Sequence, residues 1–220
     1  MTRLAARNGL CYDSDIAVRH LTDADPKLGA LIERAGPFTM QPQPTQSIFG
    51  ALARSIVYQQ LSGKAAATIL GRVTDLFPRR KLTPEELLAL RPEQLRGAGI
   101  SANKLAALQD LAELTLDGTV PTLRKIRTLS DDEIIERLTQ VRGIGRWTVE
   151  MLLIFRLGRP DVLPVGDLGV RKGFAHTYRH RKLPDAARMT RVAERWRPYR
   201  SVGSWYMWRA VDLERDGKTG

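Results

Sequence analysis

The chain has 220 residues and a formal net charge of +11, and its 43% hydrophobic and 27% charged residues are ordinary for a globular protein with one core or two packed lobes. A basic field of this size attracts polyanions such as DNA or RNA through counterion release, although a basic protein that is merely soluble remains an alternative. The single Cys11 excludes an internal disulfide and a four-thiolate iron–sulfur cluster. No apolar run approaches the roughly 18 residues of a membrane span. We therefore expect an intracellular protein that is neither secreted nor membrane-bound.

The N-terminal part predicts a surface arm followed by one helix. Residues 1 to about 22 show weak periodicity, which favours an arm on the surface. Asp25 is a candidate N-cap for a helix whose apolar residues fall at positions 28, 31, 32 and 35, and Gly36-Pro37 ends that helix. Residues 41–44, Gln-Pro-Gln-Pro, then predict a short stiff linker.

Residues 48 to about 77 predict two helices with an unusual polar link between them. The apolar residues at helical spacing are Phe49, Leu52, Ile56 and Val57 on the first helix and Ala65, Ile69, Leu70 and Val73 on the second. Two adjacent amides, Gln59 and Gln60, interrupt the apolar end of the first helix. A polar helix terminus that hydrogen-bonds its own backbone is one interpretation of this pair.

The next stretch predicts a second hairpin of helices with a mainly structural role. Thr83 caps a helix with Pro84 in its first turn, and Ser101 after the Gly97-Ala-Gly99 turn caps a helix over 102–116. Lys104 near the start of that helix is a candidate phosphate contact. Since helix follows helix and no alternating strand pattern persists, we expect an all-α protein.

The stretch from Ser130 to Phe155 predicts a helix-hairpin-helix. Ser130 and Glu133 form a capping box, which opens a helix that ends at Gly143. The apolar positions expected on the two helices are Ile134, Ile135, Leu138 and Val141 on the first and Trp147, Met151, Leu152 and Phe155 on the second.

The tight Gly143-Ile144-Gly145 turn between these helices suits a nucleic-acid backbone. It places unpaired N–H groups at a helix N-terminus, and two missing side chains let a phosphate come close. An ordinary glycine-containing turn between packed helices is the alternative.

An aspartate about 20 residues beyond the turn adds a second feature. Asp167 follows Pro164 and Gly166 and precedes the apolar stretch 168–174, as expected for a carboxylate at the start of a helix. A simple N-cap is one role for it, and catalysis is the other.

Together, the Gly-Ile-Gly turn, its helix and Asp167 resemble the helix-hairpin-helix Gly/Pro-Asp superfamily of DNA glycosylases. Residues 143–148 and 196–208 look like the 3-methyladenine DNA glycosylase II branch, and the similarity runs from about Asp25 to about Arg209. The resemblance implies a single all-α domain over 1–220 with an active site in a cleft between two helical lobes. One lobe would span about 45–157, and the other about 1–44 plus 158–220.

The resemblance also implies an activity. Such an enzyme flips alkylated, cationic bases out of double-stranded DNA and hydrolyses the N-glycosidic bond, leaving an abasic site for base excision repair. It needs no cofactor and is expected to be a monomer. Relatives that also cut the strand carry a lysine where this chain has Trp147, so we expect no lyase activity.

By the same resemblance, Asp167 is the catalytic carboxylate that faces the developing positive charge on the sugar. The base pocket would be lined by Trp147, Trp208, Met151 and Tyr58, and the resemblance implies an aromatic ring at the position of Met151. For either tryptophan, core packing is the alternative. Gln60, with Gln59 and Leu61 beside it, would be the wedge that fills the gap left by the extruded nucleotide.

The hairpin would bind the DNA backbone. The residues expected there are Gly143, Ile144, Gly145, Arg142 and Arg146, and Arg171 and Lys172 are further candidates that could equally be solvated charges. The family often holds Na⁺ or K⁺ on backbone carbonyls, which here would be those of Thr139, Val141 and Ile144. The competing hypothesis is a non-catalytic helix-hairpin-helix DNA-binding module, which would have no use for Asp167 or the two tryptophans.

Overall fold

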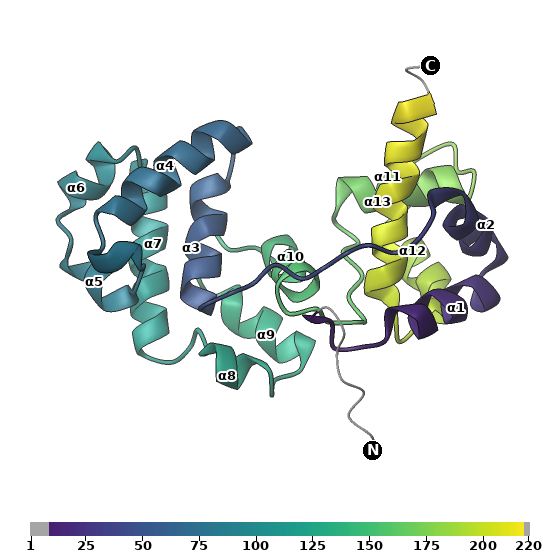
Figure 1. The fold of residues 1–220 in the computed structure, drawn as a ribbon, viewed down its shortest axis with the longest axis horizontal. Helices are drawn as coiled ribbons and strands as arrows, with labels where there is room; N and C mark the ends of the chain where they lie inside the picture. Colours follow the sequence, from purple (N-terminus) through teal and green to yellow (C-terminus); the bar gives the residue numbers. More distant parts are fainter. Residues whose placement is uncertain (1–8, 218–220) are drawn as a thin grey trace. The chain divides into compact units, whose positions relative to one another are not determined.

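The computed structural model describes residues 9–217, and within them it contains helices and no strand, which confirms the all-α prediction (Figure 1). Contacts between residues divide the chain into two compact units. One comprises residues 44–149, and the other comprises the described residues up to 43 together with those from 150 onward. The boundary lies inside α10 (Arg146–Phe155), whereas the two predicted lobes met at residue 157. No described helix is both long and apolar enough to cross a membrane.

In the unit of residues 44–149, helices α3 and α7 pack against each other (Figure 1). Its elements in order are α3 (Ile48–Tyr58), α4 (Gly63–Asp75), the 3₁₀ turn η2 (Pro78–Arg80), α5 (Pro84–Ala89), α6 (Pro92–Gly97), α7 (Ala102–Leu116), α8 (Leu123–Ile126), α9 (Asp131–Leu138) and the start of α10. Fully buried leucines and isoleucines such as Leu52, Ile56, Leu111 and Ile134 form its core.

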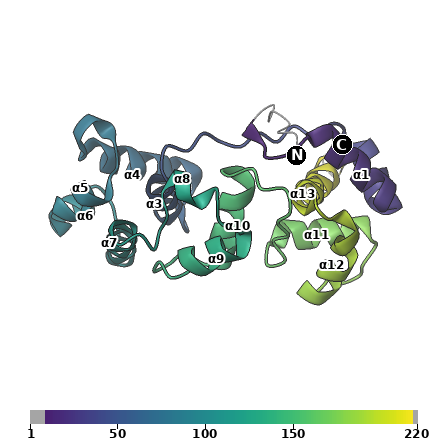
Figure 2. The ribbon, with the colours of Figure 1, turned by 90° about the horizontal axis from the view of Figure 1, so that it is seen from below.

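The second unit surrounds its C-terminal helix. Its elements are α1 (Ser14–Ala24), α2 (Pro26–Ala35), the rest of α10, α11 (Leu168–Thr177), α12 (Ala186–Ala193), the 3₁₀ turn η3 (Glu194–Trp196) and α13 (Arg200–Gly217). α11 lies against α13 (Figure 2), and a Cβ added at Gly173 would come within 2.1 Å of the Met207 carbonyl oxygen. Only glycine therefore allows the backbones of these two helices to approach so closely.

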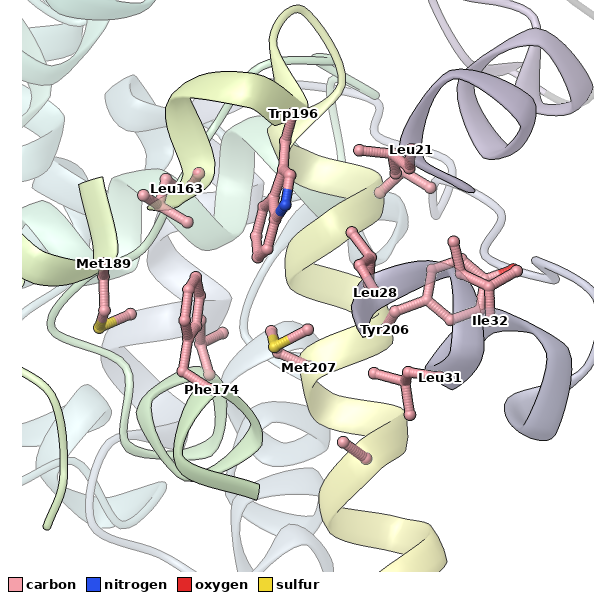
Figure 3. Close-up of a cluster of buried hydrophobic side chains, with 14 of the residues drawn as sticks. Leu21, Leu28, Leu31, Ile32, Leu163, Phe174, Met189, Trp196, Tyr206 and Met207 are labelled. Atoms are coloured by element: carbon pink, nitrogen blue, oxygen red, sulfur yellow. The ribbon is translucent and has the colours of Figure 1, made fainter. Parts of the chain in front are cut away.

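Large aromatic and sulfur-containing side chains fill the core of this unit. Phe174 stacks on Trp196 with ring centroids 4.9 Å apart, and Tyr206 and Met207 project from α13 into the same cluster (Figure 3). Buried Asp25 ties the cluster together, because it caps α2 and also accepts hydrogen bonds from Tyr178 Oη at 2.5 Å and Trp196 Nε1 at 3.1 Å. Burial, followed by the hydrogen bond to Asp25, raises the pKa of Tyr178 well above its ordinary value.

Three predictions about helices need correction. Residues 14–22, predicted as part of a surface arm, belong to α1, which buries Ala17 and Leu21 completely; residues 1–8 of that arm lie outside the described residues. On α4 the interior alanine is Ala66, whereas Ala65, which was predicted to face inward, is exposed; the other predicted positions, Ile69, Leu70 and Val73, are half-buried or buried. Helix α9 ends at Leu138, not at Gly143.

Candidate functional site

The hairpin turn, residues 139–145, links α9 to α10 without helical structure. Gly143 has a φ of +77°, which only glycine adopts at little cost, and the Gly145 carbonyl accepts the first hydrogen bond of α10 from Val149 N at 3.3 Å. The Arg142 N–H donates to Asp110 Oδ2 on α7 at 2.7 Å, so the turn is fixed to the neighbouring helix. The predicted helix-hairpin-helix is therefore present.

The two glycines of the turn are needed for different reasons. Gly143 is required by its positive φ. Gly145 has no left-handed φ, is exposed, and a Cβ added there would meet no protein atom within 4 Å. The fold therefore explains the first glycine and leaves room for another molecule at the second.

Trp147 follows this turn, and its position differs from the one predicted. Its side chain is 52% exposed, whereas the buried face of α10 consists of Val149, Leu152, Leu153 and Ile154. Arg142 and Arg146 are also exposed, and Met151 is half-buried. An exposed indole and two exposed arginines at one turn form a surface suited to stacking and to phosphate.

The polar link between α3 and α4 forms a tight turn, which we call the wedge turn (Tyr58–Leu61). Gln60 lies at its tip, exposed and with a φ of +57°, and Leu61 is 38% exposed. Tyr58 is half-buried, and the Arg54 guanidinium lies 4.0 Å from the centre of its ring. The Gln59 side chain donates from Nε2 to the Gly143 carbonyl at 2.8 Å, which joins the wedge turn to the hairpin turn.

Lys104, the candidate phosphate contact, makes two hydrogen bonds within the protein that were not expected. Its ammonium donates to the carbonyls of Val57 at 2.7 Å and Gln59 at 2.9 Å, at the C-terminal end of α3. Burial lowers the pKa of this lysine. No pattern in the sequence signalled these contacts, because they join residues 45 or more positions apart.

Asp167 and Trp208 come together in the other unit. Asp167 caps α11 as predicted, with Oδ1 accepting from Val170 N at 2.8 Å, and the same Oδ1 accepts from Trp208 Nε1 at 2.8 Å. A Cβ added at Gly169 would come within 2.6 Å of Trp208 Cδ1, so glycine makes room for the indole. The Phe155 ring lies 5.4 Å from that of Trp208. The result is a half-buried carboxylate, oriented by two donors, beside aromatic rings.

The remaining candidates contribute less to this geometry. Arg171 donates from Nε to the Pro184 carbonyl at 3.2 Å, which ties it to its own unit, and Lys172 is exposed. The Val141 carbonyl accepts the Ile144 N–H at 3.0 Å and keeps a second lone pair, so it is compatible with a role as cation ligand. Among the described residues, no group of three or more His, Cys, Asp or Glu side chains could hold a metal ion.

Known proteins share both the sequence and the fold of this chain. A family model described as "HhH-GPD superfamily base excision DNA repair protein" matches residues 53–198. DNA-3-methyladenine glycosylase 1 of Schizosaccharomyces pombe is 38% identical over 200 residues, which cover 88% of this chain and 86% of that protein.

Two solved structures support the same relationship. The S. pombe 3-methyladenine DNA glycosylase in complex with abasic DNA matches with a TM-score of 0.76 and 37% identity, covering 88% of this chain and 95% of that one. A DNA-3-methyladenine glycosidase from Bacillus halodurans matches with a TM-score of 0.82 and 34% identity, covering 91% of each chain.

Proposed function

The chain belongs to the HhH-GPD superfamily of base excision DNA repair proteins, and from this membership we propose that it is a DNA glycosylase that excises alkylated, 3-methyladenine-type bases and leaves an abasic site. The observation that carries the proposal is the Asp167 carboxylate, whose Oδ1 is fixed by the N–H groups of Val170 and Trp208 at 2.8 Å each. A carboxylate oriented in this way is suited to stabilising positive charge that develops on a bound sugar.

The chemistry follows from the charge of the substrate. Alkylation at a ring nitrogen makes the base cationic, so the base can leave with the electron pair of the glycosidic bond and needs no general acid. The sugar then carries positive charge, which the Asp167 carboxylate stabilises. Water adds to the anomeric carbon, and the carboxylate orients this water or accepts its proton.

The base must leave the stack before this reaction can occur. Extrusion costs a few kcal/mol, which interactions with the protein must offset. Gln60, exposed at the tip of the wedge turn, would fill the gap, with Leu61 beside it. The indoles of Trp147 and Trp208, together with Met151 and Tyr58, would line the base pocket, and an indole face stabilises a cationic base by about 1–2 kcal/mol.

The hairpin turn would hold the DNA backbone. Arg142 and Arg146 are exposed, and Gly145, which lies between them in the sequence, leaves open space; both features favour a phosphate over a base edge. The carbonyls of Thr139, Val141 and Ile144 would hold a Na⁺ or K⁺ ion, whose charge would add to the attraction for phosphate. Binding should therefore depend steeply on salt and little on sequence.

The reaction is proposed to stop at the abasic site, with the protein acting as a monomer. A lyase of this family needs an amine nucleophile directly after the hairpin, and this chain has Trp147 at that position. Borohydride added during turnover should trap no covalent adduct between protein and DNA, and strands should break only after alkali. A trapped adduct would overturn this part of the proposal.

Asp167→Asn tests the catalytic role, because the amide keeps the capping oxygen and removes the negative charge. A capping role alone predicts a stability loss of about 1 kcal/mol or less and near-normal excision. Stabilisation of the sugar cation predicts unchanged melting and DNA affinity, with single-turnover excision slower by roughly a hundredfold or more. The substrate is a duplex carrying 3-methyladenine or 7-methylguanine.

The same excision assay tests the competing function, a non-catalytic DNA-binding module. A wild-type protein that binds duplex DNA and excises none of 3-methyladenine, 7-methylguanine, 1-methyladenine and hypoxanthine would favour the module. An Asn variant that excises at the wild-type rate would instead remove Asp167 from the mechanism.

A further inference from the structure

The wedge turn is held in a conformation that its sequence disfavours. Leu61 N donates to the Tyr58 carbonyl at 3.4 Å, Gln59 has φ −55° and ψ 131°, and Gln60 has φ +57°. These values match a type II turn, whose third position normally belongs to glycine. A residue with a Cβ persists there only where its surroundings over-determine the backbone, and such residues concentrate at functional sites.

Lys104 is the first element of those surroundings. Its Nζ donates to the carbonyls of Val57 and Gln59, and the Gln59 carbonyl belongs to the peptide that leads directly into Gln60. The positive charge also lies at the C-terminal end of α3, where the helix dipole favours a cation. The ammonium therefore fixes the peptide plane on which the direction of the Gln60 side chain depends.

Gln59 and Asp110 connect this turn to the hairpin. The Gln59 side chain donates to the Gly143 carbonyl at 2.8 Å, and Asp110 Oδ2 accepts the Arg142 N–H at 2.7 Å. Lys104 and Asp110 both project from α7, so one helix holds the backbones of both turns. All of these groups lie in the unit of residues 44–149.

We propose that Gln59, Lys104 and Asp110 are positioning residues that fix the wedge turn to the hairpin turn, so that binding of a DNA phosphate sets the depth at which Gln60 enters the duplex. This inference rests on the proposed function. Two turns that act on one duplex must keep a fixed spacing, because a displacement of about 1 Å is enough to cost a large factor in rate. These three residues form a brace between the two turns, which acts on extrusion of the base and has no part in breaking the glycosidic bond.

Gln59→Leu tests the brace at an accessible position. The leucine keeps the size of the side chain and loses the donor to Gly143, while solvent can hydrate the freed carbonyl, so the fold should persist. Gln59→Lys restores a donor of sufficient length. Gln94→Leu is the matched control, since Gln94 lies in the same unit and the hydrogen bond that it loses, Oε1 accepting from Arg91 N at 3.0 Å, is local to the start of α6.

Single-turnover excision is compared for one lesion in a fully paired duplex and in an unpaired loop. We expect Gln59→Leu to slow excision from the paired duplex about tenfold, as loss of one hydrogen bond from the extruding complex predicts, and to leave the loop within about twofold. Lys104→Met should act in the same direction, Gln59→Lys should recover most of the loss, and Gln94→Leu should match the wild type. Equal slowing on both substrates, or no slowing on either, would overturn the inference.

A second measurement separates this inference from the proposed function. 2-Aminopurine beside an abasic-site analogue in duplex DNA reports extrusion by its fluorescence, without any excision. A wild-type protein that raises this fluorescence and excises no alkylated base would contradict the proposed function alone. Gln59→Leu should reduce the fluorescence rise while affinity for undamaged duplex stays within about twofold; a wild-type rise in the variant would overturn the brace.

Discussion

Trp208→Phe separates two roles of Trp208, as a wall of the base pocket and as a donor to the catalytic carboxylate. Phenylalanine keeps an aromatic face and loses the Nε1–H that lies 2.8 Å from Asp167 Oδ1. A hydrogen bond to a charged acceptor contributes about 1.5–3 kcal/mol. Since Val170 N still donates to the same oxygen at 2.8 Å, we expect a loss near the lower end of this range, or slightly more than tenfold in the single-turnover rate.

A double-mutant cycle shows whether Trp208 acts through Asp167. If it does, Trp208→Phe should slow the wild-type enzyme and have little further effect in the Asp167→Asn background. Trp205→Phe is the matched control, because Trp205 also projects from α13 but packs against Phe38, with ring centroids 4.9 Å apart. Both variants are compared by thermal melting and by affinity for an abasic-site duplex.

Three results would refute this reasoning. Excision by Trp208→Phe at the wild-type rate would show that the indole N–H contributes nothing to the reaction. Fully additive losses in the double variant would show that Trp208 works independently of Asp167, as a pocket wall would. A loss confined to cationic bases would point the same way, because cation–π attraction depends on the charge of the base.

Three further predictions address the hairpin turn, the wedge turn and the helix that precedes the hairpin. Gly145→Thr should leave melting nearly unchanged, because its Cβ meets no protein atom within 4 Å, while affinity for all duplexes falls alike; loss for one lesion only would contradict backbone binding. Gln60→Gly should stabilise the fold by about 0.5–1 kcal/mol in denaturant titrations, since glycine adopts the positive φ without strain, and it should slow excision from paired duplex. Gln60→Ala keeps the backbone strain, so it should slow excision without stabilising the fold. Hydrogen bonds from the Ser130 N–H and hydroxyl hold the pKa of Glu133 below its ordinary value. The stability that the Glu133 carboxylate contributes is therefore present above its unfolded-state pKa and is lost as the pH falls through its folded-state pKa. The difference in Tm between wild type and Glu133→Gln should shrink on acidification, and a difference that stays constant with pH would exclude the capping hydrogen bonds as its cause.

The sequence predicted helix starts well because caps are local. Asp25, Ser101, Ser130 and Asp167 were all expected as N-caps, and each accepts a backbone N–H of its own first turn. A cap needs only residues within three positions of one another. The hairpin was predicted correctly from signals that are also local, namely the Ser130 cap of α9 and the two glycines of the turn.

Predictions that depended on periodicity were less reliable. Val141 continues the apolar pattern of α9 in the sequence and was therefore predicted to lie on that helix. It is buried as expected, but it lies beyond the end of α9 at Leu138. Trp147 has the spacing of an interior residue and is 52% exposed. Helix α1 contributes only Ala17 and Leu21 to the buried core, too few for a clear pattern. Periodicity records apolar residues and carries no information on what covers them.

The brace between the two turns could not have been predicted at all. Gln59 and Gly143 are 84 positions apart, and the Lys104 and Asp110 contacts likewise depend on how α7 packs. The paired amides at Gln59 and Gln60 were the only signal in the sequence. We had considered that such an amide could hydrogen-bond the backbone of its own helix terminus. Gln59 does bond a backbone carbonyl, but that carbonyl belongs to Gly143 in the hairpin turn.

The glycines of the chain show where the fold alone stops explaining the sequence. Gly143 is required by its φ, Gly173 by the approach of α11 to α13, and Gly169 by the ring of Trp208. Gly145 meets no such requirement, and alongside it Trp147 exposes a large indole that would gain free energy by burial. Each feature would be unfavourable or unnecessary in a protein that bound nothing at this turn. A phosphate backbone against Gly145 and a base against Trp147 account for both features. The hairpin turn and Asp167 therefore require different tests. Substitutions in the hairpin turn should weaken binding to every duplex, whereas substitutions of Asp167 should slow the reaction of duplex that is already bound.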